Sequence, residues 1–403
     1  MEPPRVKHLG LAGIVRDETP FLREWVDFHL LAGIERFVLY DNGSREPVAR
    51  TLAPYVEAGL VQVLDWPGPH RQMEAYRHCL AEYGGGFRWL AFLDADEFLF
   101  ATSGDLRALL TEFEDCGGLA ANWVLFGSSG HQSRPAGFQI ENYLLRLPLR
   151  GMVNQHVKCL VRPERVLGPA SVHHFAYREG FGCVSERRWP VPGPYAPHSV
   201  ERVRVHHYYY RSREDFEAKI ARGMAHPVVG RDGYRPEEFA TQEAAAMEED
   251  RAALRFLPRL RFLTRQPDAR AALELAERWS TLPAHEALGL SMGQAAKGDA
   301  AGAEETLRLA LFHDPGNAGL RLGLAALLRG LGRFETALEV AQAALRLQST
   351  PEGWLELARI EEARGEAETG ARVREFLRGS LKREGQLTPE WTLRLAGNQG
   401  GGK

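Results

Sequence analysis

The sequence contains little cysteine. Four cysteines, Cys79, Cys116, Cys159 and Cys183, stand among 403 residues, and no two of them form a C-x-x-C pair. Structural zinc sites and disulfide frameworks require clustered or regularly spaced cysteines, so the sequence favours neither. Isolated thiols fit a reducing compartment, and we therefore expect a cytoplasmic protein.

Long apolar runs are also absent. No stretch reaches the roughly 18 apolar residues that a membrane-spanning helix requires, and the opening residues MEPPRVKHLG lack the apolar core of a secretory signal. We expect no transmembrane segment. Peripheral attachment to the inner face of a membrane stays open beside a purely cytoplasmic location.

Neither sign of charge dominates. The chain has 50 Lys and Arg residues against 53 Asp and Glu residues, a formal net charge of −3, and 44% hydrophobic residues. Because there is no general excess of positive charge, we expect no nucleic acid partner, although short basic clusters such as SERRW occur. The length predicts two or more domains with a sizeable core. The frequent Ala, Arg, Leu and Gly are compatible with a GC-rich bacterial genome.

Strand-like and helix-like segments alternate in the first third of the chain. Apolar runs predict strands over 8–15, 35–42, 60–66, 88–96 and 118–127, and amphipathic segments predict helices between them. Strands that alternate with helices form a mainly parallel sheet with helices on both faces, so we expect an α/β, Rossmann-like domain. Such sheets bind ligands at the carboxyl ends of their strands.

Acidic residues gather at those predicted strand ends. VRDE, YDNGS and WLAFLDADEFLF each place carboxylates at the end of an apolar run. Asp94 and Asp96 have one residue between them, so in an extended strand their side chains point the same way. Two converging carboxylates repel each other unless a cation lies between them, and oxygen ligands suit Mg²⁺ or Mn²⁺. The alternative is a pair of solvated carboxylates that cap the next turn.

Several separated motifs follow one another in the first half of the chain. They are IVRDETPFLREWVDFHLLAGIERFVLYDNGS, Q-x-x-A-Y-x-H-C, WLAFLDADEFLF, NWVLFGSSGH, HVKCLVRP, VHHF and HHYYYRSREDFEAKIARG. In this order, over about residues 8–225, they resemble the glycosyltransferase family 2 and family 92 group, which has a GT-A fold. The resemblance implies a nucleotide-sugar-dependent glycosyltransferase whose D-x-D acids bind a divalent cation under the donor's diphosphate.

The resemblance also implies roles for individual residues. Asp94 and Asp96 match the cation ligands, and His207 matches a later histidine that completes the metal or diphosphate site, with His173 as the alternative. A partly buried, hydrogen-bonded histidine is the competing interpretation for both. The implied donor-binding residues are Arg16, Glu18, Asp41, Gln72, Tyr76, Asp94 and Lys158.

The resemblance gives Asp41 a specific contact, whereas other residues have more than one interpretation. Asp41 matches the acid that contacts the nucleotide base or ribose. Gln72 and Tyr76 are equally compatible with polar helix residues near the surface. Arg162 and Arg211 are further candidates for holding phosphates, with surface solvation as the alternative.

The catalytic base has no clear match. An inverting transferase needs a carboxylate or a histidine that deprotonates the acceptor hydroxyl, and inversion is implied only by the resemblance. The ED pair that many members of the wider fold use is missing at the expected distance. Glu97 and His131 are the candidates that we name, with Glu141 and Glu186 as further options.

After about residue 270 the composition changes to helices rich in Ala, Leu, Glu and Arg, and a repeat begins. One copy starts at Gly298 and the next at Gly332, 34 residues later. This period, with small residues at helix crossings and a turn proline at Pro315, is typical of tetratricopeptide repeats. A weaker third copy follows. An ordinary helical bundle is the alternative.

These features divide the chain into four parts. We expect a GT-A domain over 1–225, a helical linker over 226–270, tetratricopeptide-like repeats over 271–381 and a flexible tail over 382–403. Stacked helical hairpins form concave surfaces for peptides or proteins, so the repeats predict a protein partner.

The sequence therefore predicts a metal-dependent glycosyltransferase that moves a sugar from a nucleoside-diphosphate sugar, a UDP-sugar, to a hydroxyl of a glycan, lipid or protein. Trp123 and Phe126 precede the expected acceptor loop, where core packing and sugar stacking are both open. A sugar nucleotidyltransferase is disfavoured because AGIVRDET lacks the glycine-rich loop of that class. The non-enzymatic alternative is a scaffold that binds a partner through its repeats and carries a degenerate transferase domain.

Overall fold

The structure, a computed structural model, describes residues 7–223, 236–264, 268–270, 274, 283–314 and 316–396. The chain divides into two compact units, Met1–Glu274 and Leu275–Lys403. Each unit has hydrophobic clusters of its own, and each is described separately.

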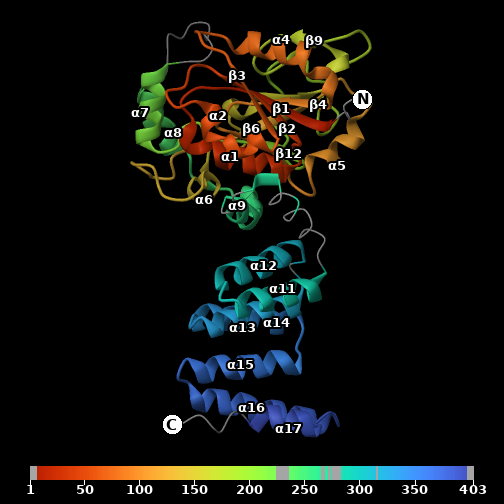
Figure 1. Cartoon of the computed structure of the whole chain (residues 1–403), viewed down its shortest axis with the longest axis vertical. Helices are drawn as coiled ribbons and strands as arrows, with labels where there is room; N and C mark the ends of the chain where they lie inside the picture. The colour runs from red at the N-terminus through yellow and green to blue at the C-terminus, as the bar shows by residue number, and fades with distance from the viewer. Residues whose placement is uncertain are drawn as a thin grey trace. The chain divides into compact units, whose positions relative to one another are not determined.

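A nine-stranded sheet forms the centre of the first unit (Figure 1). Eight strands follow the order β3-β2-β1-β4-β8-β6-β12-β5, and β11 pairs with β6. Their bounds are β1 Lys7–Val15, β2 Arg36–Asp41, β3 Val61–Asp65, β4 Phe87–Phe92, β5 Glu97–Ala101, β6 Gly118–Leu125, β8 Val157–Val161, β11 Cys183–Ser185 and β12 Val203–His207.

The first unit is α/β, as expected, and its main sheet is mixed with a parallel majority, since five of the eight described strand pairings are parallel. The strands β3, β2, β1 and β4 pair in parallel, whereas β8 runs antiparallel to both β4 and β6, and β5 runs antiparallel to β12. Since β12 is parallel to β6, β6 and β12 have the direction of β4. The carboxyl ends of β1, β2, β4, β6 and β12 therefore lie at one edge.

Helices cover both faces of this sheet. Successive strand residues point to opposite sides, so β1 contacts a different helix on each face. Ala12 and Ile14 of β1 pack in one core cluster with Tyr76 of α4 (Gln72–Glu82). Gly13, between them, faces Trp25 of α1 on the other side. Figure 1 shows α4 and α1 on opposite sides of the strands.

The helix α1 (Thr19–Ala32) has the start and stop signals that the sequence suggests. Pro20 occupies the first turn, where its fixed φ suits the helix. Gly33 ends the helix with a φ of 109°, a left-handed conformation that favours glycine. The buried Trp25 donates its indole N–H to the carbonyl of Glu97 at 2.8 Å, which ties α1 to the start of β5.

The sequence predicts a helical linker over 226–270, but residues 236–264 are a part of the first unit. The helices α8 (Pro236–Ala245) and α9 (Leu257–Leu263) flank β13 (Glu248–Glu249), which pairs with β7 (Leu145–Arg146). Glu243 of α8 accepts backbone N–H groups of Ser128 and Gly130. These contacts are nonlocal, and no local sequence pattern reveals them. Residues 226–235 lie outside the described residues.

The second unit consists of paired helices, and this confirms the predicted repeat. The pairs are α11 Ala284–Ala296 with α12 Ala300–His313, α13 Ala318–Gly330 with α14 Phe334–Leu347, and α15 Pro351–Ala363 with α16 Ala367–Arg383. The turns inside the pairs contain Gly298, Gly332 and Gly365, all with positive φ. Ala303 and Ala337, 34 residues apart, are both fully buried. Pro315 lies outside the described residues.

The predicted flexible tail contains a helix, α17 (Pro389–Ala396). Leu395 is buried in a cluster with Leu377 and Leu381, and Trp391 packs against that cluster. Thr388-Pro389 repeats the Thr-Pro start of α15, so the sequence carried a signal for this helix that the expectation missed. Residues 397–403 lie outside the described residues.

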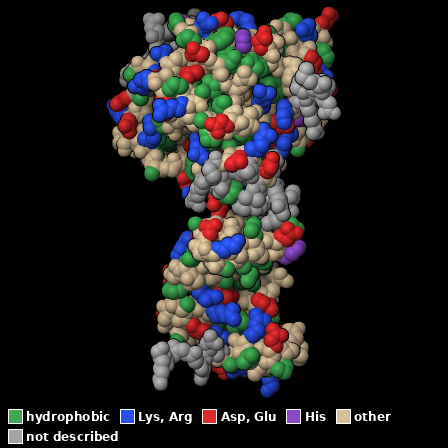
Figure 2. Space-filling view, in the orientation of Figure 1, with side chains coloured by type: hydrophobic (Ala, Val, Ile, Leu, Met, Phe, Trp, Pro, Cys, Tyr) green, Lys and Arg blue, Asp and Glu red, His purple; other side chains and the backbone are tan. Residues whose placement is uncertain are grey.

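The surface agrees with the balanced charge of the sequence. Basic and acidic side chains are interspersed over the face of each unit that Figure 2 shows. Among the helices that the structure describes, none is both long and apolar enough to cross a membrane. The cytoplasmic location stays a prediction.

Candidate active site

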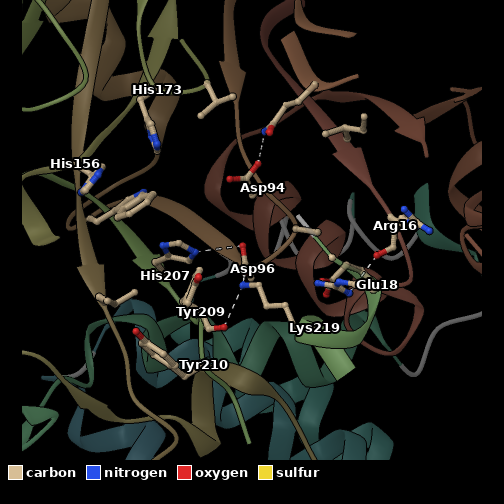
Figure 3. A pocket seen from close by; sticks show the side chains of 18 of the residues that line it. Arg16, Glu18, Asp94, Asp96, His156, His173, His207, Tyr209, Tyr210 and Lys219 are labelled. Atoms are coloured by element: carbon tan, nitrogen blue, oxygen red, sulfur yellow. Dashed lines mark hydrogen bonds and ion pairs between the residues drawn. The ribbon is translucent and has the colours of Figure 1, made fainter. Parts of the chain in front are cut away.

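A pocket of about 390 Å³ lies at the carboxyl edge of the sheet. Its wall comes from the ends of β1, β2, β4, β6 and β12 and from the helices α4, α7 (Arg213–Arg222) and α8. Pockets for small ligands typically measure about 300–1,000 Å³. In Figure 3, Asp94 and Asp96 lie between His156, His173 and His207 on one side and Arg16 and Glu18 on the other.

The two D-x-D acids leave the sheet in a turn, not in an extended strand. The strand β4 ends at Phe92, and the backbone N–H of Glu97 donates to the carbonyl of Asp94 at 3.1 Å. The side chain of Glu97 closes the same turn, since its Oε2 accepts the N–H of Asp94 at 2.8 Å. The acids therefore do not converge as alternate strand residues would, and each has its own partners.

Asp94 is paired with side chains of β8 and α4. Its carboxylate accepts from Nζ of Lys158 at 2.9 Å and from Nε2 of Gln72 at 2.6 Å. Lys158 is 1% exposed and also lies 3.2 Å from Oε2 of Glu97. Burial opposes the charge of Lys158, but Asp94 and Glu97 outweigh it and raise the pKa of this lysine well above its usual value.

Asp96 is paired from the side of α7 (Arg213–Arg222). Its Oδ2 lies 2.6 Å from Nζ of Lys219, and its Oδ1 lies 3.4 Å from Nε2 of His207. Burial alone would raise the pKa of Asp96, but Lys219 and His207 hold it well below its usual range. Burial lowers the pKa of His207, which makes its imidazole neutral near pH 7.

Glu97 does not reach the pocket, contrary to its assignment as a candidate base. It is fully buried, and burial together with Asp94 and Asp96 raises its pKa to about 8 despite the nearby Lys158. Its carboxyl group holds the backbone of Asp94 and so positions the turn. A group enclosed in this way cannot touch an acceptor.

The other candidate bases also lie away from the pocket wall. His131 has its Nε2 3.3 Å from the carbonyl of Asn142. Glu141 accepts the N–H of Phe138, and Glu186 accepts backbone N–H groups before β12. The remaining pocket-lining carboxylates are Glu18 and Glu238.

Four predicted donor-binding residues line the pocket, namely Arg16, Glu18, Gln72 and Asp94. Tyr76 is fully buried behind Gln72, whose Nε2 donates to the Tyr76 hydroxyl at 3.0 Å. Asp41 is also turned away, because its two oxygens accept the backbone N–H groups of Ser44 and Val48.

Two arginines have structural partners. Arg162 forms ion pairs with Glu114 and Glu164 away from the pocket. Arg211 donates to Glu18 at 2.6 Å and to the carbonyl of Ala95 at 3.3 Å, so it holds the backbone of the D-x-D turn. Neither side chain lines the pocket.

The aromatic side of the pocket centres on Trp123. Its ring stacks on His156 at 4.6 Å and meets His207 and His173 edge-on at 4.4 and 5.1 Å. Burial lowers the pKa of His156 and, helped by Lys158, holds that of His173 well below its usual value. This side therefore presents neutral rings. Phe126 packs against His206 in the core.

The residue types fit a divalent cation, and Asp96 and His207 lie 3.4 Å apart. Asp94, Asp96 and His207 all line the pocket, and carboxylate and imidazole are suitable ligands for Mn²⁺. Among the described residues, however, no three such side chains are grouped so as to hold a metal ion. The ammonium group of Lys219, which lines the same pocket, lies 2.6 Å from Oδ2 of Asp96.

Among the charged and amide side chains that line the pocket, four were not anticipated: Asn42, Lys219, Arg222 and Glu238. Lys219 and Arg222 stand three residues apart in EDFEAKIARG, which places them on one helix face, so this signal was present in a motif from which we took only His207 and Arg211. Asn42 directly follows Asp41. Glu238 belongs to the segment expected to be a linker.

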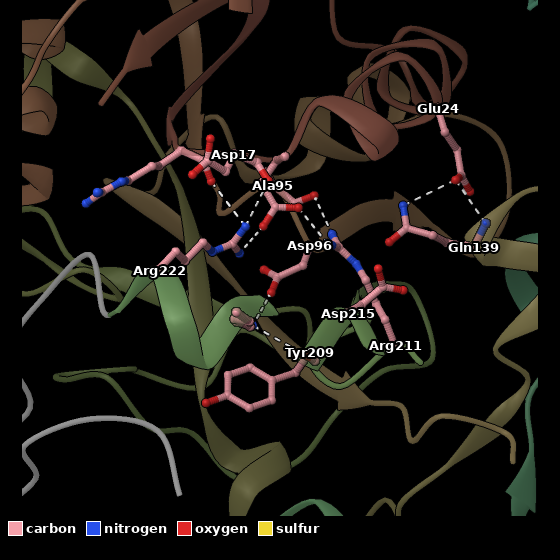
Figure 4. Close-up of polar contacts among 12 residues, drawn as sticks. Asp17, Glu24, Ala95, Asp96, Gln139, Tyr209, Arg211, Asp215 and Arg222 are labelled. Carbon is pink, nitrogen blue, oxygen red and sulfur yellow. Dashed lines mark hydrogen bonds and ion pairs between the residues drawn. The ribbon is translucent and has the colours of Figure 1, made fainter. Parts of the chain in front are cut away.

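The helix α7 is anchored against the first strand ends, as Figure 4 shows. Ser212 caps its start by accepting the N–H of Asp215. Arg222, in its last turn, donates to the carbonyls of Arg16 and Asp17 and to the carboxylate of Glu18. These bonds fix the face of α7 that carries Lys219.

Comparison with known proteins gives two family matches. The family model described as "Glycosyltransferase family 92" matches residues 11–217, and one for the tetratricopeptide repeat matches residues 294–360. The family 2 component of the resemblance stays a prediction.

Individual relatives cover part of the chain. A glycosyltransferase family 92 protein of Ricinus communis is 28% identical over 224 residues, 54% of this chain and 38% of the relative. A family 92 protein of Arabidopsis thaliana is 28% identical over 241 residues, 56% of this chain and 39% of the relative. The chain thus spans less than two fifths of these relatives. Both are plant proteins, and a bacterial origin stays a prediction.

Two further similarities are more limited. A galactan beta-1,4-galactosyltransferase of Arabidopsis thaliana is 36% identical over 89 residues, 20% of this chain and 17% of the relative. The crystal structure of S. aureus TarS 1-349 aligns over 94% of this chain and 92% of that chain, with 12% identity and a TM-score of 0.29. That score is too low to support a fold assignment.

Proposed function

Since the chain belongs to glycosyltransferase family 92, we propose that it transfers a sugar from a nucleoside-diphosphate sugar to a hydroxyl acceptor. The observation that carries this proposal is the pocket in which Asp94 and Asp96 stand between a charged side and a side of neutral rings. Such a pocket offers separate surfaces to a charged donor and to an uncharged acceptor.

The donor occupies the charged side in this proposal. The nucleoside lies against the ends of β1 and β2, where Arg16 and Asn42 line the pocket, and the diphosphate lies towards Asp96 and Lys219. UDP is the nucleotide that the resemblance favours. The arrangement is consistent with the rule that parallel sheets bind nucleotides at the carboxyl ends of their strands.

The reaction breaks the bond between the sugar's anomeric carbon and the diphosphate oxygen, which keeps the electron pair. The acceptor oxygen forms the new bond to that carbon and loses its proton. Cationic side chains beside the departing diphosphate lower the barrier because they stabilise the charge that develops there. Inversion of the anomeric centre is part of the proposal through the family resemblance.

A divalent cation, Mn²⁺ or Mg²⁺, remains a proposal that the resemblance supports. When bound, it would supply Lewis-acid stabilisation of the leaving diphosphate. Asp96 and His207 are the adjacent pair best suited to hold it, 3.4 Å apart.

The acceptor lies on the aromatic side in this proposal. Trp123, His156 and Tyr210 line that side, and rings of this kind pack well against the apolar faces of sugars. A glycan is therefore the acceptor class that the pocket suits best, before a lipid or a protein hydroxyl. One relative is named a galactan beta-1,4-galactosyltransferase, and galactan is a glycan.

Glu238 is our candidate for the base. It is the pocket-lining carboxylate that α8 contributes. Glu238→Gln should lower kcat by at least about 100-fold and leave the KM for the donor within about twofold. A kcat within threefold of the wild type would remove Glu238 from this role.

The proposal is tested with a panel of nucleotide sugars. UDP-, GDP- and dTDP-linked sugars are offered with Mn²⁺, and binding and hydrolysis are measured by calorimetry and nucleotide release. We expect one nucleotide class to bind with a micromolar Kd, as is common for enzyme substrates. If no nucleotide sugar binds at millimolar concentration, the proposed function is wrong.

The second unit supplies a partner surface in this proposal. Tetratricopeptide repeats form concave surfaces that bind peptides or proteins. We propose that this unit recruits an acceptor-bearing protein or another enzyme of the same assembly. The truncation described in the Discussion tests it.

A further inference from the structure

The pocket holds a cation of its own beside the second acid. Nζ of Lys219 donates to Oδ2 of Asp96 at 2.6 Å and to the carbonyl of Tyr209 at 3.1 Å. The same ammonium lies 3.7 Å from the centre of the Tyr209 ring. Three contacts therefore fix it at the pocket wall, where the Lys219 residue is only 8% exposed.

The two lysines that face the D-x-D acids differ in access. Lys158 is 1% exposed, lies behind Asp94 and is shared with the buried Glu97. It does not line the pocket, whereas Lys219 does. Only the ammonium on Asp96 is thus placed where a ligand in the pocket can reach it.

The position of Lys219 is built into α7. Arg222, one turn further along the helix, is held by the carbonyls of Arg16 and Asp17 and by Glu18. Figure 4 shows this anchor next to the contact between Asp96 and α7. Because Arg222 is engaged by the chain itself, Lys219 is the cation of this helix that is directed at the acid pair.

The charge of a bound diphosphate allows the Lys219 ammonium to exchange its contact with Asp96 for one with a phosphate, or to share both. A diphosphate brings about two negative charges close to a carboxylate, which is unfavourable unless a cation is shared between them. An ammonium group has three N–H donors and can serve two anions at once. The Tyr209 carbonyl and ring keep the Lys219 ammonium in place when a second anion arrives.

We propose that Lys219 binds the β-phosphate of the donor and stabilises it as the leaving group, with Asp96 as the counter-ion that holds the ammonium before the donor binds. This inference rests on the proposed function. When the anomeric C–O bond breaks, the diphosphate oxygen keeps the electron pair, and Lys219 neutralises that charge without giving up a proton. The acceptor's proton leaves to the base.

Lys219 and a divalent cation would compete for the same carboxylate. A Mn²⁺ ion at Asp96 and His207 would lie close to the Lys219 ammonium and be repelled by it. The inference therefore predicts nucleotide binding without metal, and tighter metal binding when the lysine is removed. Both effects are measured without enzyme turnover.

The experiment measures the affinity of the full-length protein for UDP, UMP and GDP in EDTA by calorimetry. Wild-type protein should bind one diphosphate, and Lys219→Met should weaken that binding by about tenfold or more, as expected for a lost charge-assisted hydrogen bond. UMP binding should change by less than about threefold, because the monophosphate lacks the β-phosphate. Lys219→Arg should restore most of the loss.

A second set of variants covers the case in which Lys219→Met does not fold. Asp96→Asn with Lys219→Met removes both charges, whereas Asp96→Asn alone keeps the ammonium. In EDTA the single variant should bind the diphosphate at least about tenfold more tightly than the double variant. Arg213→Met, an exposed cation of the same helix, is the control and should bind like the wild type.

Direct Mn²⁺ titration completes the test. Without nucleotide, Lys219→Met should bind Mn²⁺ about tenfold more tightly than the wild type, since the repulsion is gone. Equal diphosphate affinity of the Asp96→Asn and double variants would overturn the inference, as would a wild type that binds diphosphates only with Mn²⁺. If neither UDP nor GDP binds even with Mn²⁺, the proposed function fails as well.

Discussion

Asp27 of α1 is a buried ionisable group that does not line the pocket. Its carboxyl group is 1% exposed and accepts the hydroxyl of Tyr55 at 2.6 Å. Burial raises its pKa from 3.8 to about 7. The folded chain thus keeps this proton over a pH range in which the unfolded chain has lost it, so the free energy of unfolding falls as the pH rises from about 4 to about 7.

Asp27→Asn should remove this pH dependence, because the amide cannot ionise and still accepts the Tyr55 hydroxyl. Relative to the wild type, the variant should gain on the order of 2–4 kcal/mol in unfolding free energy between pH 4 and pH 8. Urea unfolding at several pH values measures it, with the exposed Asp65→Asn as the control. A difference between Asp27→Asn and wild type that stays constant with pH would contradict the assignment.

The two D-x-D acids should differ in their contribution to stability. Asp94→Asn leaves Lys158 paired with Glu97 at 3.2 Å, whereas Asp96→Asn leaves the Lys219 ammonium without its carboxylate. We expect Asp96→Asn to cost about 3–5 kcal/mol of unfolding free energy and Asp94→Asn roughly 2 kcal/mol less. Thermal and urea unfolding measure both. The reverse order would show that the lysine pairs are not as described.

The sequence predicted the pocket better than it predicted the roles within it. Asp94, Asp96 and His207 were placed in one site from strand ends and motifs, and the structure brings them together. Glu97 and Asp41 were misassigned because a side chain that closes its own turn has the same local sequence as one that faces a ligand. Which of the two it does depends on the backbone N–H groups within reach.

Gly13 controls the approach of β1 to the D-x-D turn. A Cβ atom at this position would lie 2.8 Å from the carbonyl oxygen of Leu93, the residue before Asp94. Gly13→Ala must therefore shift the backbone that carries the acids. We expect a loss of about 1–3 kcal/mol in unfolding free energy and nucleotide binding weakened at least about tenfold.

The control for this change is Gly86→Ala, where a Cβ atom would meet nothing within 4 Å. That variant should stay within about 0.5 kcal/mol of the wild type and bind nucleotide normally. If Gly13→Ala binds nucleotide as the wild type does, the close approach of β1 does not position the acids.

Elements were predictable where their signals were local. The strands β1 to β4 and the helix α1 follow from apolar runs and caps. The strands β8 and β12 were not recognised, because each is five residues long and is defined by partners far away in the sequence. The helices α7 and α8 bring Lys219 and Glu238 to the pocket through contacts that span more than 100 residues.

The two units should be separable in function. Each has its own core, and every described residue that lines the pocket belongs to the first unit. Ending the chain after Glu274 should leave the Kd for the nucleotide within about twofold of the full-length value, because it removes none of those lining residues. Acceptor use should fall at least about tenfold if the repeats recruit the acceptor.

Calorimetry and transfer assays with several acceptors measure these two quantities. Unchanged activity with every acceptor would reject the recruitment role. Loss of nucleotide binding in a folded truncated chain would instead show that the units are coupled. A scaffold without catalysis would keep partner binding and cellular effect after Asp94→Ala with Asp96→Ala.

The most direct test of the central claim is nucleotide release from a nucleotide sugar by the full-length protein. Wild-type protein should release nucleoside diphosphate from one donor, faster with a glycan acceptor present. Asp94→Asn combined with Asp96→Asn should reduce this rate at least about 100-fold, while circular dichroism confirms that the variant is folded. Release that is absent from the wild type, or equal in the folded variant, would contradict the account.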